Sequence, residues 1–420
     1  MTGIQALLRR LTVFLCFVFS CLFVFSPIVG HARSGPTEAN ADRVTRLVPY
    51  GDPSDAGPAG PRIPLILVHG IWITPDWNMD HHLDGFEAAT MAGWKAFLDS
   101  PSWRSLEGRF TPYIFYFLSN EASVSDLAGS LHRRIQAMVS AGRMPAGPQV
   151  ILAHSMGGLI ARSYAQEHAD SSAPGSVRIM GLITLATPHH GSLGANCESR
   201  EELAGNADRR DGAWEGFWCW GWRNNWTAIM KLISAILWTK PLERVDCTEP
   251  NRKDLLWDNY DGLLGSGKTD TNEWLRRLNN DTSKDSKLIL YYGSTDVRSE
   301  TFEALRRKVY SCGLFKSVGP KAVPIAALRN AGKEVIHEAL LGSSALLYLG
   351  VHRDGYDPMA NDGLVPEKSG SFDGHTVRKR VFCADHDHLH MLAGNGTVAC
   401  STGKTLFESL AEDLRELADK

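Results

Sequence analysis

Short apolar runs recur along the chain, and helical patterns and polar turns separate them. Fully apolar runs that are bounded by turn residues are typical of strands buried on both faces of a sheet. Their alternation with helical patterns predicts βαβ units, and therefore a mostly parallel sheet with active residues at the carboxyl ends of its strands. The predicted strands are 64–68, 111–118, 150–152, 177–186, 287–292 and 377–382.

Two stretches carry apolar residues at helical spacing. A stripe of this kind is typical of a helix that buries one face against the rest of the molecule. The second stretch predicts a closing helix packed on the sheet. The first stripe consists of Leu127, Leu131, Ile135, Met138 and Val139, and the second of Leu406, Leu410, Leu414 and Leu417.

A turn of small residues joins a predicted strand to a helical pattern within Gln149–Arg162 (QVILAHSMGGLIAR). Ser155 lies on this turn, with Ala153 two residues before it and Gly157 two residues after it. A nucleophile elbow needs small residues at both positions, because strand and helix backbones crowd together there. Ala153 departs from the usual G-x-S-x-G pattern by one methyl group. Ser155 is therefore the candidate nucleophile, and the alternative is an ordinary helix N-cap serine.

A second candidate feature follows strand 64–68, where the chain continues as His69-Gly70-Ile71-Trp72. Acyl transfer places negative charge on the former carbonyl oxygen, which fixed backbone N–H groups stabilise. The amides of Ile71 and Met156 are the predicted oxyanion hole. His69 directly follows a buried strand, so we expect it to brace the loop by hydrogen bonds rather than to act as the base.

Length and composition predict a globular protein. A chain of 420 residues with 43% hydrophobic content can bury a large core, as one large domain or two ordinary ones. The net charge of −3, without a run of Lys or Arg, argues against a nucleic-acid partner. Residues Gly262–Thr269 (GLLGSGKT) match the P-loop pattern, but no buried strand precedes them, so we do not predict nucleotide binding.

Residues 1–32 have the pattern of a cleaved signal peptide. Arg9 and Arg10 precede the apolar run 13–25, and small residues follow at 30–32. This pattern predicts a secreted or periplasmic protein. The alternative is an uncleaved membrane anchor, but the run is shorter than the roughly 20 residues that a spanning helix needs. The polar, Gly- and Pro-rich residues 33–62 are predicted to be a flexible linker.

Six cysteines remain once the signal peptide, with Cys16 and Cys21, is set aside. They form no C-x-x-C pair, so in an oxidising compartment they predict up to three disulfides, with the pairing left open. Free buried cysteines are the alternative if the protein is not exported. The six are Cys197, Cys219, Cys247, Cys312, Cys383 and Cys400.

Candidate acids and bases gather in the C-terminal part of the chain. Asp296 follows strand 287–292, and Asp362 lies in the segment NDGLVP. Three histidines, His386, His388 and His390, crowd into the segment DHDHLHM. Alternating histidines can ligate a metal, but a serine that transfers an acyl group needs a neighbouring imidazole. A general base is therefore the simpler interpretation, and no metal is predicted.

Six segments together resemble the α/β-hydrolase lipases and esterases, including those similar to GPI inositol-deacylases. They span roughly residues 63 to 395. The resemblance implies an α/β-hydrolase domain over 63–420, with a mostly parallel sheet flanked by helices and no cofactor. The segments are LILVHGIW, AHSMGGLIAR, TLATPHHGS, WLRRLN, NDGLVP and DHDHLHM.

The resemblance also implies which acid and which base form the triad. Asp362 matches the lipase pattern better than Asp296, because in that pattern a long insertion separates the strand from the acid. His388 aligns with the D-H-L base of these enzymes, with His386 and His390 as alternatives. Some bacterial lipases have a calcium-bound Asp where this chain has His390, so the resemblance implies no such calcium site.

Two insertions interrupt the alternation of strands and helices, at 197–247 and 297–360. The first contains six tryptophans, five of them before the apolar run 228–238, and Trp rings settle where apolar and wet phases meet. In the lipases that this chain resembles, a lid is inserted after the same strand. The first insertion is therefore predicted to be a lid or cap that makes transient contact with a lipid interface, and the alternative is a disulfide-pinned subdomain with inward-facing tryptophans.

The sequence thus predicts an exported serine hydrolase that cleaves carboxylic esters, with acylglycerol-type lipid esters favoured. Ser155, Asp362 and His388 occur in the Ser, Asp, His order of α/β-hydrolases. The alternatives are an inactive hydrolase-fold binding protein and an acyltransferase that uses an alcohol acceptor. The acyl chain length, the ester class and the oligomeric state stay open.

Overall fold

The structure is a computed structural model, and all the residues that it describes fall within the unit Pro36–Lys420. The predicted signal peptide, the insertion 197–247 and residues 297–359 lie outside the described residues. Among the described residues, no helix has the length and apolar character needed to span a membrane. The described residues are 41–51, 62–70, 94–106, 108–118, 122–169, 177–192, 253–262, 272–296, 360–362, 364–384, 386, 388, 390–393 and 399–420.

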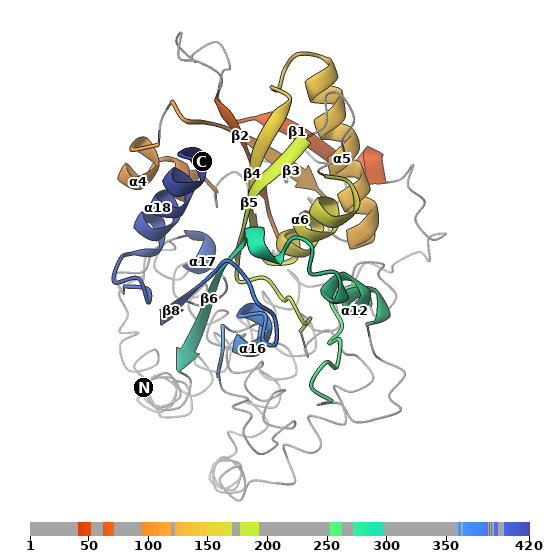
Figure 1. The fold of residues 1–420 in the computed structure, drawn as a ribbon, viewed down its shortest axis with the longest axis vertical. Helices are drawn as coiled ribbons and strands as arrows, with labels where there is room; N and C mark the ends of the chain where they lie inside the picture. The colour runs from red at the N-terminus through yellow and green to blue at the C-terminus, as the bar shows by residue number, and fades with distance from the viewer. Residues whose placement is uncertain are drawn as a thin grey trace, which may run out of the picture. The chain divides into compact units, whose positions relative to one another are not determined.

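An eight-stranded sheet forms the centre of the described fold (Figure 1). The order is β1-β3-β2-β4-β5-β6-β7, and β8 also pairs with β6. Five pairings are parallel, while β1–β3 and β6–β7 are antiparallel. The prediction of a mostly parallel sheet is confirmed. The strands are β1 (Thr45–Pro49), β2 (Ile63–Val68), β3 (Phe110–Phe117), β4 (Gly147–His154), β5 (Val177–Leu185), β6 (Leu288–Asp296), β7 (Ala360–Asn361) and β8 (Lys379–Ala384).

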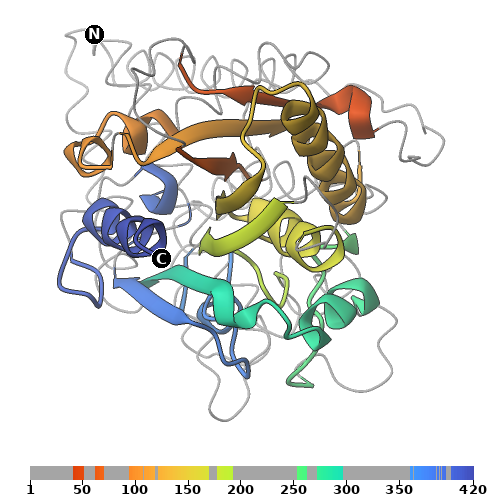
Figure 2. The ribbon, with the colours of Figure 1, turned by 45° about the horizontal axis from the view of Figure 1, so that its top comes forward.

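Helices cover both faces of the sheet (Figure 2). Helices α5, α6 and α12 share one apolar core with one face, and α4, α17 and α18 share a second core with the other. Central strands are therefore buried on both sides, which is why β2 and β4 read as continuous apolar runs. The helices are α4 (Pro101–Arg104), α5 (Val124–Ser140), α6 (Met156–Glu167), α12 (Glu273–Asn280), α16 (Glu367–Gly370), α17 (His390–Ala393) and α18 (Leu406–Ala418), with 3-10 turns η1 (Asp42–Val44) and η6 (Asp285–Lys287).

Both predicted helical stripes face the sheet. In α5 the stripe is buried except for Val139, which is partly buried against the same core. In α18 all four leucines are buried, and Thr405 and Glu408 form a capping box that begins the helix. The predicted closing helix packed on the sheet is therefore confirmed.

The N-terminal edge of the sheet differs from the expectation of a flexible linker over 33–62. Within that segment, β1 pairs antiparallel with β3, and Thr45 and Leu47 are buried. Asp42, just before β1, links the start of this strand to α5, because its carboxylate accepts hydrogen bonds from Ser130 Oγ (2.6 Å) and Arg133 Nε (2.8 Å). The alternating burial spans so few residues that the surrounding Gly- and Pro-rich composition obscured it.

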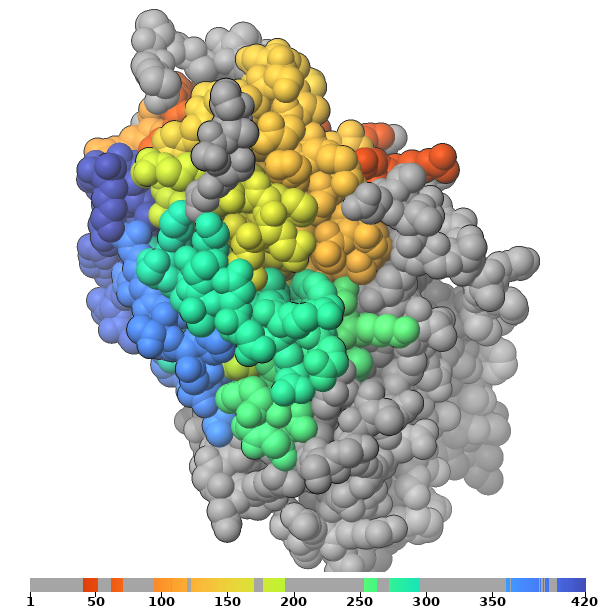
Figure 3. Space-filling model, turned by 45° about the vertical axis from the view of Figure 1, so that its right-hand side comes forward, coloured from red at the N-terminus to blue at the C-terminus, as the bar shows by residue number. Residues whose placement is uncertain are grey.

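Residues 253–262 lie beside α12 on the surface of the molecule (Figure 3), and Asp254 joins them to α5. Its Oδ2 accepts a hydrogen bond from Val124 N (2.7 Å) in the first turn of that helix. Burial raises the pKa of Asp254 to about 7, against an ordinary value of 3.8. A raised pKa means that this group stabilises the fold fully below pH 3.8, and that this stabilisation is lost as the pH rises through about 7.

Asp254→Asn is therefore expected to remove this pH dependence. The amide cannot ionise, but its oxygen can still accept from Val124. The melting temperature of the variant minus that of the wild type should be a few degrees larger at about pH 8 than at about pH 5. Thermal unfolding at both pH values tests this, with Asp99→Asn as the control because Asp99 forms an exposed pair with Lys95. An unchanged difference between Asp254→Asn and wild type at the two pH values would contradict it.

Candidate active site

Ser155 occupies a one-residue turn between β4 and α6. Its φ of 56° and ψ of −133° lie in a region that residues other than glycine rarely adopt. Two neighbours hold the turn: Ser155 N donates to Leu185 O (2.8 Å), and Thr187 Oγ1 donates to Ser155 O (3.0 Å). The predicted strand, turn and helix around Ser155 are confirmed.

Glycines around the turn allow its close approach to neighbouring segments. A Cβ at Gly157 would overlap the backbone carbonyls of Val68 and His69, and one at Gly70 would overlap the Ser155 side chain. Ala153, by contrast, is buried within β4, between its partners on β2 and β5. Its methyl group is therefore accommodated in the sheet, and the departure from G-x-S-x-G leaves the elbow intact.

His388 lies between Ser155 and Asp362. Its Nε2 is 2.8 Å from Ser155 Oγ, and its Nδ1 is 2.9 Å from Asp362 Oδ2. With Nδ1–H donating to the carboxylate, Nε2 of the neutral ring accepts the hydrogen bond of the serine hydroxyl. The exposed fractions of Ser155, His388 and Asp362 are 7%, 6% and 2%, so all three are largely shielded from bulk water.

Asp362 is held by its own turn as well as by the histidine. Its Oδ1 accepts hydrogen bonds from the amides of Leu364 (3.0 Å) and Val365 (2.7 Å), which leaves Oδ2 directed at the ring. The backbone carbonyl of Asp362 also accepts from His388 N (2.8 Å). The carboxylate is thus fixed on both sides before any substrate binds.

Asp296, the alternative acid, lies near Asp362 in the fold. It ends β6, where its backbone pairs with Ala360 of β7, and Asp362 directly follows β7. The chain leaves β6 at Asp296 and therefore returns beside the same end of β6 at Ala360. Asp362 is the acid whose side chain contacts His388.

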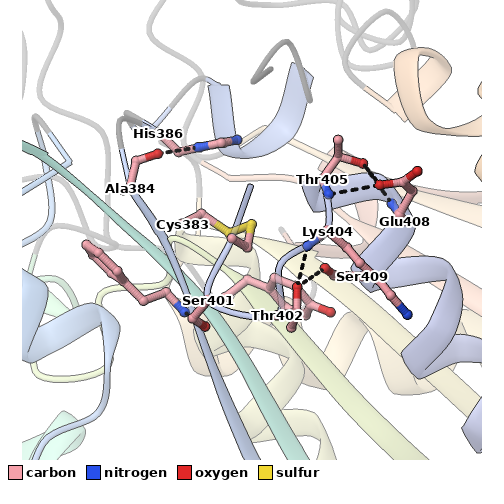
Figure 4. The surroundings of a disulfide bond; sticks show 12 residues. Cys383, Ala384, His386, Ser401, Thr402, Lys404, Thr405, Glu408 and Ser409 are labelled. Carbon is pink, nitrogen blue, oxygen red and sulfur yellow. Dashed lines mark hydrogen bonds between the residues drawn. A yellow bond between two sulfur atoms is a disulfide. The ribbon is translucent and has the colours of Figure 1, made fainter. Parts of the chain in front are cut away.

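The other candidate bases have different neighbours. His386 Nδ1 donates to Ala384 O (2.8 Å), as Figure 4 shows, and His390 begins α17. His69 is buried, its Nδ1 donates to Gly70 O (2.7 Å), and its Nε2 accepts from Phe117 N (3.3 Å). Burial lowers the pKa of His69 to about 4. His69 therefore braces the loop as a neutral ring, as expected.

A disulfide closes the segment that carries His388. It links Cys383, in β8, to Cys400, ahead of α18 (Figure 4). Beside it, Ser401 N donates to Phe382 O (2.7 Å), so both ends of the segment are pinned together. One of the expected disulfides is thus present. The other four cysteines that follow residue 32 lie outside the described residues.

The segment Thr187–Ser192 (TPHHGS) contacts both the nucleophile turn and the acid turn, which sequence reasoning did not predict. Thr187 bonds to the Ser155 carbonyl, and Ser192 Oγ donates to Leu364 O (2.6 Å). Ser369 Oγ donates in turn to Gly191 O (2.7 Å). The signal available in the sequence was a run of hydroxyl and imidazole side chains directly after a buried strand.

A buried ion pair anchors this segment. His190 and Asp258 are each 1% exposed, and His190 Nδ1 is 2.8 Å from Asp258 Oδ2. His190 Nε2 is 2.9 Å from the carbonyl oxygen of Asp373. With the Asp258 carboxylate ionised, both of these oxygens accept, so each ring nitrogen then carries a hydrogen and Asp258 balances the charge of the ring. Asn279 Nδ2 also donates to Asp258 Oδ2 (2.8 Å).

Arg162 extends the network from α6. It is buried, and its guanidinium donates to Asn279 Oδ1 (2.9 Å) and lies 4.3 Å from the centre of the Phe372 ring. Burial lowers the pKa of Arg162 to about 10, so the side chain stays charged at neutral pH. A polar hollow of about 280 Å³ borders the network at His190 and Asp258.

The remaining predicted features are only partly described. Met156 begins α6 directly after Ser155, whereas Ile71, the other predicted oxyanion donor, lies outside the described residues. Most of the P-loop match, 263–269, also lies outside them, and the preceding residues 253–262 form turns rather than a strand. Within the described ranges, no group of three or more His, Cys, Asp or Glu side chains is arranged to hold a metal.

Comparison with known proteins supports this fold. The family model described as "PGAP1-like alpha/beta domain" matches residues 125–202, which contain α5 except for its first residue, and β4, Ser155, α6 and β5. No curated protein sequence matches the chain significantly. The chain has the α/β-hydrolase fold, because its sheet order, its flanking helices and its strand-to-helix turn at Ser155 agree with that family match.

Several solved structures are similar to this chain at low sequence identity. Lipase 1 from Pelosinus fermentans is 16% identical, with a TM-score of 0.40, over 84% of this chain and 98% of that one. Lipase BlEst2 from Bacillus licheniformis is 15% identical, with a TM-score of 0.37, over 84% and 94%. A thermophilic esterase from Thermogutta terrifontis is 15% identical, with a TM-score of 0.35, over 89% and 94%.

Proposed function

We propose that this protein is a serine hydrolase of carboxylic esters. The proposal rests mainly on one observation: Ser155 Oγ, His388 and Asp362 form a continuous chain of hydrogen bonds on the turn between β4 and α6. A hydroxyl is a weak nucleophile until a neighbouring base takes its proton, and His388 Nε2 lies within reach of that proton. Asp362 orients the base. The same arrangement recurs in serine hydrolases of unrelated folds.

The proposed first half-reaction forms an acyl-enzyme. His388 Nε2 takes the hydroxyl proton as Ser155 Oγ attacks the ester carbonyl carbon, and the carbonyl π electrons move to oxygen. When the tetrahedral intermediate collapses, the bond from carbon to the alkoxy oxygen breaks, and His388 gives its proton to the departing alcohol. Asp362 compensates the positive charge that the imidazole carries between these steps.

In the second half-reaction, water takes the place of the alcohol. His388 removes a proton from the water while the water oxygen attacks the acyl carbon. The bond between this carbon and Ser155 Oγ then breaks, and His388 returns the proton to Ser155 Oγ. The amides of Met156 and Ile71 are the proposed donors to the oxyanion in both halves. The amide of Met156 belongs to the first turn of α6, where the helix dipole also favours negative charge.

Lipid esters are the proposed substrates, and export is the proposed destination. Two of the similar structures reported above are lipases by name and one is an esterase. The tryptophans of the insertion 197–247 favour an apolar ester, because indole rings bind at apolar–water boundaries. The buried Cys383–Cys400 disulfide supports an oxidising compartment, which agrees with a cleaved signal peptide over 1–32.

Labelling with a fluorophosphonate tests the nucleophile, because the probe phosphonylates a serine that a neighbouring base has activated. We expect one labelled site in the purified protein, mapped to Ser155 by peptide mass spectrometry, and no label in Ser155→Ala. A folded wild-type sample that takes up no label would contradict the proposal and favour an inactive binding protein.

The substrate class is tested with p-nitrophenyl esters of increasing chain length in the same preparation. Activity that rises toward long, aggregated esters is expected for a lipid hydrolase, whereas a short-chain optimum would contradict the proposed substrate. Adding an alcohol acceptor distinguishes hydrolysis from acyl transfer. A transesterified product that dominates in dilute alcohol would identify an acyltransferase.

A further inference from the structure

His154 lies beside the proposed catalytic residues without belonging to the triad. It ends β4, directly before Ser155, and its side chain is 4% exposed. β4 is the central strand between β2 and β5, and its register with both is defined up to its last residues. The imidazole of His154 is therefore carried by a strand that is paired with a neighbour on each side.

The partner of His154 is the backbone of the proposed base. His154 Nε2 lies 2.8 Å from the carbonyl oxygen of His388, and the two ring centres are 4.9 Å apart. A carbonyl oxygen can only accept, so Nε2 carries the hydrogen and donates it. His154, which directly precedes Ser155, thus holds the peptide group on the C-terminal side of His388.

The other peptide group of His388 is tied to the acid, because its N–H donates to Asp362 O (2.8 Å). The base is therefore fixed through its backbone at both ends, by Asp362 on one side and His154 on the other. A shift of the His388 carbonyl would change the reach of its Nε2 toward Ser155.

We propose that His154 is a positioning residue, whose bond to the His388 carbonyl sets the imidazole at hydrogen-bonding distance from Ser155 Oγ. This inference rests on the proposed function of Ser155 and His388. It assigns His154 no contact with substrate. Misplacement of a catalytic group by about 1 Å can cost about 100-fold in rate, so the effect should appear in kcat rather than in KM.

The test compares three substitutions at position 154 in the full-length protein. His154→Leu removes the donor, and His154→Asn keeps a polar side chain that is too short to reach the carbonyl. His154→Gln places an amide N–H near the position of the imidazole Nε2. We expect kcat to fall roughly 10- to 100-fold in the Leu and Asn variants, with KM unchanged within about threefold, and the Gln variant to recover most of the loss.

The matched control is His132→Leu, which removes a half-buried imidazole from α5. It should leave kcat at the wild-type value. If His154 had only a structural role, its substitution would lower the melting temperature but would not lower kcat, where kcat is calculated from the amount of serine that the fluorophosphonate labels. Wild-type kcat in His154→Leu and His154→Asn, or a Gln variant as impaired as the Leu variant, would overturn the proposal. The Asn variant keeps the test valid if the Leu variant does not fold.

A second measurement does not depend on turnover. The Nδ1–H of His388, bonded to Asp362, should give a low-field proton resonance that is lost in His388→Gln. We expect this resonance to broaden in His154→Leu and to persist in His154→Gln, because the ring moves more once its backbone is released. An equally sharp resonance in wild type and His154→Leu would overturn the inference. Failure of the proposed function would instead appear as a wild type that neither takes the label nor hydrolyses esters.

Discussion

Replacing Ser155 by alanine is expected to lower kcat for ester hydrolysis by about 10⁴- to 10⁶-fold, because the reaction then loses its nucleophile and its acyl-enzyme. The fold should be unaffected. Ser155 holds the turn through backbone bonds to Leu185 and Thr187, and these bonds do not use its hydroxyl. An unchanged melting temperature and circular dichroism spectrum would establish that the loss is chemical.

The triad interpretation makes a stricter prediction about combined variants. Residues that act as one unit are strongly non-additive, since removal of any member disables the others. The Ser155→Ala/His388→Ala double variant should therefore be about as slow as Ser155→Ala alone. Steady-state kinetics with one chromogenic ester measures Ser155→Ala, His388→Ala and the double variant. Multiplication of the two single losses in the double variant, or near-native turnover in Ser155→Ala, would contradict the mechanism.

Local patterns in the sequence were sufficient to predict the central strands and the long helices. Strands such as β2 and β4 are covered on both faces, so their apolar runs are continuous and easy to recognise. The Ser155 turn was predictable for a related reason. Its crowding requires small residues at fixed positions, and Ala153 and Gly157 occupy those positions in the sequence itself.

The pairing of His388 with Asp362 was predictable only through family resemblance. Nothing local distinguishes Asp362 from Asp296, because both belong to the same end of the sheet once β7 pairs with β6. The antiparallel edge strand β1 was missed for a different reason. Its stability comes from pairing with β3 and from the contacts of Asp42 with α5, and neither is visible in the composition of residues 33–62.

The buried network around His190 was also beyond local reasoning. Its members come from separate parts of the chain, and each looks ordinary by itself: Asp258 lies in a turn-rich segment and Asn279 near the end of a helix. The functional meaning of TPHHGS depends on these distant partners. Through them, the segment that contacts both Ser155 and the acid turn is held by a buried charge pair.

Removing the carboxylate of that pair is expected to cause the largest loss of stability among the substitutions considered. Asp258→Asn leaves the His190 cation without its counter-charge in a site that is 1% exposed. Breaking a buried ion pair at one partner typically costs about 3–5 kcal/mol, because the remaining charge is neither solvated nor paired. At about 2–4 °C per kcal/mol for a large domain, the melting temperature should fall by roughly 6–20 °C.

Thermal and urea unfolding of four proteins would test this expectation: wild type, Asp258→Asn, His190→Gln and the double variant. Coupled partners should be non-additive, so the double variant should lose less stability than the sum of the two single losses. Asp99→Asn provides the exposed counterpart, because its pair with Lys95 is more than half solvent-accessible and should contribute little to stability. A loss in Asp258→Asn no larger than that of Asp99→Asn would mean that hydrogen bonding rather than charge holds the segment beside Ser155.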